Sequence, residues 1–460
     1  MEQIPFLYDL FCQSSGVTTD TRQCGEGMMF LALKGERFDG NAYAQQALEK
    51  GCSCAVIDDA RYLSDNKRLV LVDDVLSSLQ QLARYHRREL GTPIIGITGT
   101  NGKTTTKELV AAVLSRTLRT HYTHGNLNNQ IGVPLTLLQL TSSHQMAVVE
   151  MGASHPGDIR ELVEIAEPDF GIITNVGRAH LQGFGSFEGV IRTKGELYDF
   201  LRTRPSGTIF LNDGDEHLRS IAEGLKAIRY GKASSPSTSL DVRGELIACD
   251  PYLRFRWQAA GDADWHEVST RLVGGYNIDN ALCAIAVGCH FGVPAADICE
   301  AIESYTPSNS RSQLVQTGAN TLVVDAYNAN PTSMRTALLN FSQMTGSHKM
   351  VIAGDMRELG EASATEHDAI VQLLASCGFE QVWLVGDNFC QALKNFRDKT
   401  SDKPASSLPS DDTMGNSPVF RTFSCVEDVL TQLQQTSLNG MTILIKGSNS
   451  MRLASLVPAL

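Results

Sequence analysis

The chain has 460 residues, of which 42% are hydrophobic and 20% charged, a composition typical of a globular protein with about two or three domains. Its formal net charge of −12 argues against a nucleic-acid-binding protein, which would carry a basic patch. The chain begins without the basic and apolar stretches of a secretory signal, and no apolar run approaches the roughly 20 residues of a membrane span.

The cysteines indicate a reducing compartment. Eleven of them are scattered along the chain, and no pair has Cys-x-x-Cys spacing. An odd number of thiols in apolar segments is typical of reduced, mostly buried cysteines. The sequence therefore predicts a cytoplasmic protein without a cysteine-ligated metal cluster.

Residues 1–91 form the first predicted domain, a small α/β unit. Its last helix is expected near residues 77–89, and the turn Gly91-Thr-Pro93 is a credible linker. Short apolar runs predict strands at 29–33, 54–57 and 69–72.

The second predicted domain, residues 92–306, opens with the most informative motif of the chain. An apolar run, Ile94-Ile-Gly-Ile97, leads into Gly99-Thr-Asn-Gly-Lys-Thr-Thr105, and helical periodicity follows from Leu109 to Leu118. The general phosphate-loop pattern has glycine where this chain has Ile97, and a glycine-rich turn alone would be an ordinary turn. The preceding strand and the following helix favour a nucleotide phosphate site, because backbone N–H groups, the helix N-terminus and Lys103 all attract phosphate.

The rest of the second domain alternates buried strands with helical segments, which predicts a parallel sheet covered on both faces. Strands are expected at 147–150, 170–175 and 208–211. Residues 246–249 and 253–257 alternate polar and apolar side chains instead, so we expect a hairpin appended to the sheet.

The third predicted domain, residues 307–460, repeats the strand–helix order. Several of its strands end in Gly, Asp or Lys, where open α/β sheets place ligand-binding residues. The polar segment 399–418 is expected to be a surface insertion. The strands are predicted at 321–325, 350–354, 382–386, 419–423 and 442–446.

The compact Gly99–Thr105 motif resembles that of the Mur ligase family, ATP-dependent amide-forming enzymes of peptidoglycan synthesis. Blocks at residues 18–22, 30–40, 125–134, 325–330 and 354–360 are also similar to the family, in order and over nearly the whole chain. The resemblance implies an N-terminal UDP-substrate-binding domain, a central P-loop-type ATPase domain with a parallel sheet, and a Rossmann-like C-terminal domain. It also implies a cytoplasmic monomer that serves the cell wall, and hence cell shape and division.

Within the family, the first three blocks favour a ligase that adds D-alanyl-D-alanine to UDP-N-acetylmuramoyl-tripeptide through an acyl phosphate, with ATP and Mg²⁺. Another amino-acid-adding Mur ligase is the closest alternative. Folylpolyglutamate synthetases share the central site but are not expected to carry the N-terminal domain. A nucleotide-dependent switch without ligase chemistry is the alternative of a different class.

Activation of a carboxylate by phosphoryl transfer needs neutralised charge, and three residues are the first candidates for this work. Lys103 is placed to offset phosphate charge and the Thr104 hydroxyl to ligate Mg²⁺. Glu150 ends the apolar run Met146-Ala-Val-Val-Glu150 beside the phosphate loop, where a carboxylate is a usual Mg²⁺ ligand, although a solvated Glu after a strand is the common alternative.

The resemblance assigns two further metal ligands. His180 follows a buried strand, in the block where the family carries a metal-binding His. Lys194 lies 194 − 180 = 14 residues later, the spacing at which the family carries a carbamylated lysine. Carbamylation would turn the cation into an anion that ligates Mg²⁺. Without the resemblance, His180 would be interpreted as a surface or structural residue of a loop, and Lys194 as part of a solvated helix face.

The remaining nucleotide contacts come from all parts of the second and third domains. By resemblance, Asn280 contacts the adenine, Arg311 reaches the nucleotide from the domain junction and Asp325 binds the ribose. Asn277, in the same block as Asn280, has the alternative role of a plain helix N-cap. The full predicted nucleotide set is Gly99, Thr100, Asn101, Gly102, Lys103, Thr104, Thr105, Asn280, Arg311 and Asp325.

Substrate contacts are assigned collectively. Candidates for the UDP-linked substrate are Thr21, Arg22, Lys34, Asn41, Asn126, Asn128 and Asn129, and candidates for the dipeptide are Asn328, Asn330, Asp355, Arg357, Lys446 and Ser448. The asparagines have an alternative role in loop turns. His367 lies in a helical run, and we expect it to be either a dipeptide contact or a structural partner of Asp355.

Overall fold

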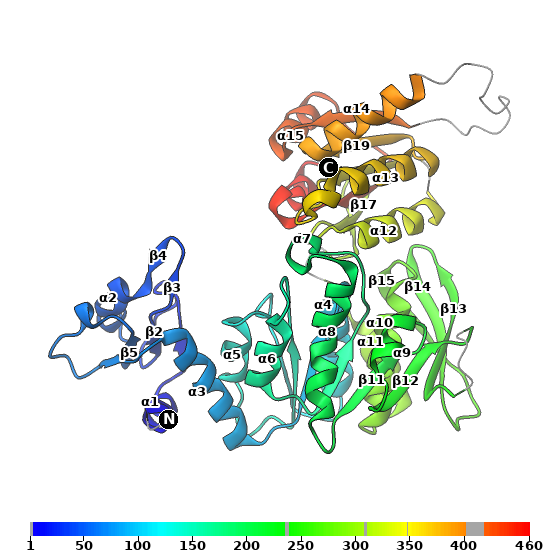
Figure 1. Ribbon diagram of the computed structural model, residues 1–460. Coiled ribbons are helices and arrows are strands. Elements are labelled where there is room, and N and C mark those ends of the chain that lie inside the picture. Colours follow the sequence, from blue (N-terminus) through cyan, green and yellow to red (C-terminus); the bar gives the residue numbers. More distant parts are fainter. Residues whose placement is uncertain (1–2, 235–238, 308–310, 347, 402–417) are drawn as a thin grey trace.

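The computed structural model describes residues 3–234, 239–307, 311–346, 348–401 and 418–460. They form three α/β units that follow one another along the chain, with the second unit between the other two (Figure 1). The predicted α/β class with three domains is confirmed. Among the described residues, every helix is too short or too polar to cross a bilayer.

The N-terminal unit has a four-stranded parallel sheet of order β1-β2-β5-β6 and a two-stranded hairpin, β3-β4. Helix α3 leads from it to the second unit, beginning after the N-cap Asp74 and ending at Gly91 with φ of 63°. The elements are α1 Gln3–Gln13, β1 Val17–Thr18, β2 Met29–Leu31, β3 Lys34–Gly35, β4 Phe38–Asp39, α2 Ala44–Glu49, β5 Cys54–Ile57, β6 Leu69–Leu71 and α3 Val75–Leu90.

The central unit is a nine-stranded sheet of order β15-β14-β13-β12-β11-β10-β7-β9-β8. Strands β7 to β13 run parallel, and β14 and β15 extend the sheet with antiparallel pairing to β13 and to each other. Its strands are β7 Ile94–Thr98, β8 Thr120–Tyr122, β9 Met146–Glu150, β10 Phe170–Ile173, β11 Thr208–Asn212, β12 Lys226–Lys232, β13 Val242–Cys249, β14 Tyr252–Ala259 and β15 His266–Val273. Its helices are α4 Lys103–Leu114, α5 Gly132–Leu137, α6 Asp158–Ala166, α7 Leu181–Phe184, α8 Phe187–Arg202, α9 Glu216–Ile221, α10 Asn277–His290 and α11 Ala295–Ser304.

Both faces of the central sheet are buried, as the continuous apolar strands predict. Ile94 and Val149 pack into a core shared with helices α3, α5, α6 and α8. Ile95, Ile97 and Val148 point to the opposite core, which α4, α10 and α11 cover. The expected hairpin exists, but it is longer than predicted and gains a third strand, β15, which was not predicted; β8 and β12 of the same sheet were not predicted either.

The C-terminal unit is a six-stranded sheet of order β16-β17-β21-β18-β19-β20, parallel except for β16. All five predicted strands are present. Helix α14 continues through Ser401, so the first residues of the segment predicted as a surface insertion are helical, and residues 402–417 of that segment lie outside the described residues. The elements are β16 Gln313–Gln316, β17 Thr321–Asp325, α12 Pro331–Gln343, β18 Lys349–Gly354, α13 Ser363–Ser376, β19 Gln381–Val385, α14 Asp387–Ser401, β20 Val419–Phe423, α15 Val426–Gln435 and β21 Thr442–Lys446.

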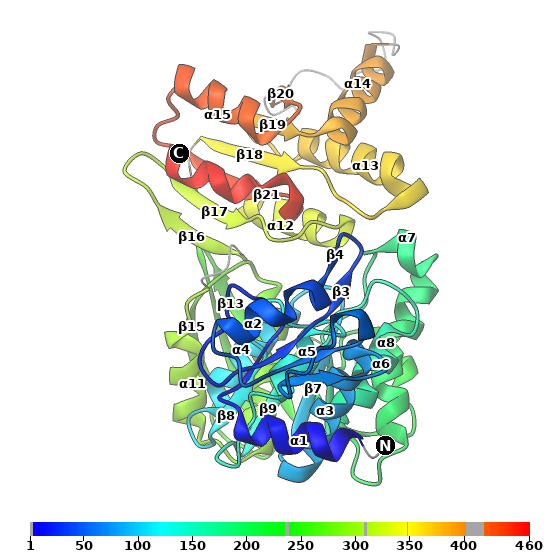
Figure 2. The same ribbon diagram turned by 90° about the vertical axis from the view of Figure 1, so that its left-hand side faces the viewer.

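The C-terminal unit sits on the end of the central sheet from which the phosphate loop emerges, whereas the N-terminal unit lies to one side (Figures 1 and 2). Hydrogen bonds between backbone amides and side chains connect the central unit to the C-terminal unit. The amide of Gly275 donates to Asn340 Oδ1 at 2.9 Å, and the amide of Thr345 donates to Asp250 Oδ1 at 3.0 Å. The site therefore forms where two sheets meet.

Candidate active site

The phosphate loop joins β7 to α4 and depends on two glycines. Gly99 has φ of 142°, and a Cβ there would lie 2.0 Å from Thr174 Oγ1. Gly102 has φ of 79°, and a Cβ there would lie 2.5 Å from Asn280 Oδ1. Larger residues at either position would therefore meet both backbone strain and a clash.

The neighbouring strand end, after β10, fixes the shape of this loop. Thr174 Oγ1 and Asn175 Nδ2 both donate to the carbonyl of Asn101, at 2.7 and 2.9 Å. The amide of Asn101 donates to Asn175 Oδ1 at 3.0 Å, and the amide of Thr100 to the Asn175 carbonyl at 3.0 Å. Four hydrogen bonds thus hold the loop open in one conformation.

Lys103 begins α4 and folds back over the loop. Its ammonium donates to the carbonyls of Gly99 and Thr100, at 2.7 and 3.1 Å. Burial and the nearby Arg311 lower the pKa of Lys103 to about 8, although Glu150 opposes the shift. Thr104, the next residue, is buried at 3% exposure.

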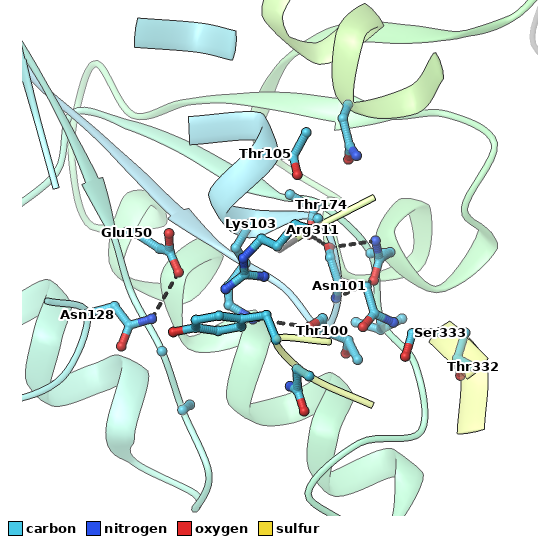
Figure 3. A pocket seen from close by; sticks show the side chains of 18 of the residues that line it. Thr100, Asn101, Lys103, Thr105, Asn128, Glu150, Thr174, Arg311, Thr332 and Ser333 are labelled. Atoms are coloured by element: carbon cyan, nitrogen blue, oxygen red, sulfur yellow. Dashed lines mark hydrogen bonds between the residues drawn. The ribbon is translucent and has the colours of Figure 1, made fainter. Parts of the chain in front are cut away.

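Glu150 ends β9 beside the loop, with one carboxylate oxygen engaged and the other free. Asn128 Nδ2 donates to Oε1 at 2.9 Å, whereas the buried Oε2 has no partner in the part of the chain that the structure describes (Figure 3). A buried, unpartnered carboxylate oxygen next to a phosphate loop has the chemistry of a Mg²⁺ ligand. Within the described ranges, no three His, Cys, Asp or Glu side chains cluster as a metal site.

His180 and Lys194 approach the site from the loop after β10 and from α8. His180 has φ of 50° and pairs through Nδ1 with Glu358 of the C-terminal unit. Burial, Lys103 and Lys194 lower the pKa of His180, although Glu358 raises it. Lys194 is 2% exposed, its Nζ lies 5.4 Å from the centre of the Phe184 ring, and burial together with Lys103 lowers its pKa well below its ordinary value.

A cavity of about 560 Å³ lies between the central and C-terminal units. Figure 3 shows Lys103 and Arg311 between the Glu150–Asn128 pair and Asn101. The cavity is large enough for a nucleotide, since ligand sites commonly measure about 300–1,000 Å³. The predicted site residues that line it are Thr100, Asn101, Gly102, Lys103, Thr105, Asn128, Asn129, Glu150, His180, Asn280, Arg311, Asp325, Asn328 and Lys446.

The C-terminal wall of the cavity presents a guanidinium and an ion pair. Arg311 stacks on Tyr327, with its central carbon 3.7 Å from the ring centre. The Asp325 carboxylate accepts a hydrogen bond of 2.5 Å from the Lys446 ammonium. Cation and carboxylate therefore alternate along this wall, as a polyanion with ribose hydroxyls requires.

Asn280 lies in the first turn of α10 and takes part in a buried network. It accepts from Thr106 Oγ1 at 3.1 Å and donates to Asn277 Oδ1 at 2.9 Å. The alternative role of Asn277 as an N-cap is wrong, because Tyr276 is the N-cap residue. Asn277 begins the helix and donates instead to the Val273 carbonyl.

The other predicted site residues do not line the cavity. Gly99, Thr104 and Lys194 lie behind its surface, and Asn330 lies at its edge, hydrogen-bonded to Asn101. The predicted N-terminal contacts lie on another unit, where Lys34 and Asn41 both bind Asp58. The complete set outside the lining is Thr21, Arg22, Lys34, Asn41, Gly99, Thr104, Asn126, Lys194, Asn330, Asp355, Arg357 and Ser448.

Asp355, His367 and their neighbours form a structural cluster at the end of β18. The Asp355 carboxylate accepts hydrogen bonds from the amides of Asn388 and Phe389 at the start of α14. His367 is fully buried, lies 3.8 Å from Asp355, and accepts from the amide of Met356. Of the two roles expected for His367, the structural partner of Asp355 matches these contacts.

Several cavity residues were not predicted. Tyr327, Thr332 and Ser333 lie in or next to the block at residues 325–330. Glu358, which does not line the cavity but pairs with the lining residue His180, lies in the block at 354–360. Their blocks were recognised, but no local pattern marks which side chain of a block turns toward the cavity. Position within a recognised block was the available signal.

The comparisons with known proteins cover almost the whole chain. Family models match as the Mur ligase family catalytic domain over residues 13–87, the Mur ligase middle domain over 97–288, and the Mur ligase glutamate ligase domain over 310–449. A UDP-N-acetylmuramoyl-tripeptide–D-alanyl-D-alanine ligase of Bacillus subtilis is 33% identical over 450 residues, which is 96% of this chain and 92% of that protein. The Escherichia coli protein of the same name is 34% identical over 377 residues, 80% of this chain and 81% of the relative.

A solved structure is similar to this chain over nearly its whole length. The crystal structure of MurF from Acinetobacter baumannii superposes with a TM-score of 0.81 at 30% identity, covering 96% of this chain and 92% of that one. The similarity therefore extends over all three units, including both walls of the cavity.

Proposed function

The chain belongs to the Mur ligase family, and we propose that it joins D-alanyl-D-alanine to UDP-N-acetylmuramoyl-tripeptide, with cleavage of ATP to ADP and phosphate, in peptidoglycan precursor synthesis. The observation that supports this most directly is the convergence of three elements on one cavity. The phosphate loop with Lys103, Glu150 with its unpartnered Oε2, and Arg311 with Asp325 all line it. Relatives named for this reaction match the chain over most of its length.

The reaction proceeds in two steps. A carboxylate oxygen of the tripeptide attacks the γ-phosphorus of ATP, the bond to the ADP oxygen breaks, and an acyl phosphate forms. The amine of D-alanyl-D-alanine then attacks the acyl carbon, its C–O bond to phosphate breaks, and the nitrogen loses a proton. Lys103 and Arg311 offset the charge on the transferring phosphoryl group, and Asp325 binds the ribose hydroxyls.

Thr104, Glu150, His180 and a carbamylated Lys194 would hold Mg²⁺. The fit rests on the unpartnered Oε2 of Glu150 and on the burial of Lys194, for which no hydrogen bond is found among the described residues. Bound Mg²⁺ supplies positive charge close to the phosphates. Burial lowers the pKa of Lys194 well below its ordinary value, which favours the neutral amine, the form that adds CO₂ to become a carbamate anion.

We assign the UDP-linked substrate to the unit of residues 1–91, ATP to residues 92–306, and the dipeptide to residues 307–460. The N-terminal contacts are Thr21, Arg22, Lys34 and Asn41, joined by the loop residues Asn126, Asn128 and Asn129. Those for the dipeptide are Asn328, Asn330, Asp355, Arg357, Lys446 and Ser448. We further propose that the protein acts as a monomer. It acts in the cytoplasm, in keeping with eleven unpaired cysteines.

Phosphate release from ATP tests the function. We expect release only when UDP-N-acetylmuramoyl-tripeptide and D-alanyl-D-alanine are both present, with the UDP-linked pentapeptide found by mass spectrometry. D-Glutamate, L-lysine and meso-diaminopimelate, each offered with its own UDP-linked precursor, serve as competing acceptors. Preference for one of these amino acids over the dipeptide would overturn the proposal in favour of another amino-acid-adding Mur ligase.

A further inference from the structure

Lys107 is a buried lysine that the reaction described above does not use. It lies on α4, one helical turn after Lys103, and is 1% exposed. Its ammonium donates to the Thr123 carbonyl at 2.7 Å and lies 3.6 Å from the Glu108 carboxylate. Burial of an ammonium is unfavourable unless its hydrogen bonds are made, so an apolar side chain would be the ordinary choice at this helix position.

Thr123, the partner of Lys107, connects α4 to the end of β9. It is fully buried and follows β8, and its amide continues the sheet by donating to the Val148 carbonyl at 3.0 Å. Its hydroxyl accepts a hydrogen bond of 3.0 Å from the amide of Glu150. Lys107 thus holds the carbonyl of Thr123, and the hydroxyl of Thr123 holds the backbone of Glu150.

Glu150 is framed by one short loop. The loop leaves Thr123 and returns at Asn128, whose Nδ2 donates to Glu150 Oε1 at 2.9 Å. The Asn128 carbonyl accepts from the amide of Gly152 at 2.7 Å, which closes the frame on the far side of Glu150. Two hydrogen bonds therefore orient Glu150, a third fixes Asn128, and Oε2 of Glu150 is left without a partner among the described residues.

We infer that Lys107 is a positioning residue, which acts through Thr123 to hold Glu150 with its free oxygen toward the cation and phosphates. The inference rests on the proposed function for the role of Glu150. Because Lys103 and Lys107 lie on one helix, the phosphate loop and the carboxylate are fixed to a single rigid element. A methionine or leucine at position 107 would fill the space but would leave the Thr123 carbonyl free to move.

Cation affinity tests this inference apart from turnover. Mn²⁺ is titrated by electron paramagnetic resonance in the presence of a non-hydrolysable ATP analogue. We expect Lys107→Met to weaken Mn²⁺ binding about 10- to 100-fold, the usual effect of losing a group that orients a metal ligand, and Lys107→Arg to recover part of it. Lys349→Met is the matched control, because Lys349 also donates to a backbone carbonyl, that of Ser342 at 2.8 Å, but in the C-terminal unit.

A second pair of variants covers the case in which Lys107→Met does not fold. Thr123→Ser keeps the hydroxyl that holds Glu150, whereas Thr123→Val removes it at nearly the same volume and leaves the carbonyl for Lys107. We expect the valine variant to lose Mn²⁺ affinity and the serine variant to retain it. A folded Lys107→Met or Thr123→Val protein with the wild-type Mn²⁺ affinity would overturn the inference.

Turnover measurements separate this outcome from failure of the function. If the wild type binds Mn²⁺ with the analogue but forms no peptide product, the proposed ligase activity is overturned, and the variants still decide the role of Lys107. If Lys107→Met forms product with the wild-type dependence on Mg²⁺ concentration, the inference is overturned and the activity stands.

Discussion

Asn330 Nδ2, at the start of α12, donates a hydrogen bond of 2.8 Å to Asn101 Oδ1 in the phosphate loop. The Oδ1 of the same Asn330 caps the helix by accepting from the amide of Ser333. Nearby, the Arg178 guanidinium lies 3.3 Å from the Glu366 carboxylate. A direct hydrogen bond therefore links the C-terminal unit to the loop that we assign to the ATP phosphates.

Asn330→Ser should raise the KM for ATP without destabilising α12. Serine remains a good N-cap but is too short to reach Asn101. Loss of one interdomain hydrogen bond is expected to raise the KM about two- to tenfold. In small-angle scattering, the radius of gyration of the wild type should decrease when ATP and the UDP-linked substrate are added. The decrease should be smaller for Asn330→Ser.

Asn395→Ser is the control for that variant, because Asn395 Nδ2 donates to Asp368 within the C-terminal unit at 3.3 Å. It should leave the KM for ATP unchanged. An Asn330→Ser enzyme with the wild-type KM and scattering profile would show that this contact does not couple the two units.

Lys103→Ala should abolish turnover and leave the fold intact. Among the described residues, the ammonium donates its hydrogen bonds to two loop carbonyls, so we expect its charge to matter for phosphate and not for packing. We expect kcat to fall by about 100-fold or more, as is typical when a group that stabilises transition-state charge is removed. Circular dichroism checks the fold. Residual activity above roughly a tenth of the wild type would contradict the phosphate-loop assignment.

The pH dependence of the same lysine can be predicted separately. Its pKa is lowered to about 8 by burial and Arg311, so the ligand-free protein loses this positive charge as the pH rises through 8. The value of kcat/KM for ATP, which reports on the free enzyme, should therefore decline above about pH 8. Lys103→Arg stays charged and should lack that decline. A wild-type kcat/KM for ATP that stays constant up to about pH 9.5, roughly 1.5 units above this pKa, would contradict the prediction.

Local patterns predicted the phosphate loop and the strand ends because each lies within one short segment. Ile94 to Thr105 carries its strand, turn and helix start in sequence, and Asp325 and Lys446 end apolar runs that pair side by side. Contacts between segments that lie far apart in the sequence could not be predicted from local patterns. Asn128 reaches Glu150 from a loop, and His180 meets Glu358 across 178 positions, which only the packing of two sheets can bring about.

Strands β12 and β15 were missed for a local reason. β12 reads Lys-Ala-Ile-Arg-Tyr-Gly-Lys, which has no continuous apolar run. β15 reads His-Glu-Val-Ser-Thr-Arg-Leu-Val, where the polar residues Ser269-Thr-Arg271 interrupt both an apolar run and a strict polar–apolar alternation. Their pairing partners in the sheet decide their conformation more than their own composition does. The same limit applies to Tyr327, whose role becomes visible only when Arg311 is stacked on its ring.

Glu167→Gln should destabilise the attachment of α3 to the central unit. Burial would raise the pKa of Glu167, but hydrogen bonds from Arg88 and Arg84 of α3 lower it to about 2. Removing the charge leaves the half-exposed Arg84 and Arg88 and the buried Arg87 without this carboxylate. We expect a loss of about 1–3 kcal/mol in unfolding free energy at pH 7, measured with urea.

The effect of Glu167 should disappear in acid. A carboxylate whose pKa is lowered on folding stabilises the native state above its ordinary pKa, and this contribution is lost as the pH falls toward the folded value. The difference between wild type and Glu167→Gln should therefore shrink between about pH 4.5 and 2. Glu427→Gln, which breaks the exposed pair with Arg452, is the control and should change stability little. Equal stability of Glu167→Gln and wild type at pH 7 would contradict the prediction.

Lys194→Ala should be nearly inactive, and short-chain carboxylates such as acetate should restore part of the activity. The side chain is 2% exposed and sits against Phe184, so the alanine variant leaves a buried space in which a small carboxylate can replace the carbamate oxygens. In the wild type, ¹³CO₂ should give a carbamate carbon signal by NMR that Lys194→Ala lacks. Lys399→Ala, at an exposed lysine of α14, should keep both the activity and the signal. A fully active wild type without any carbamate signal would show that Lys194 works unmodified.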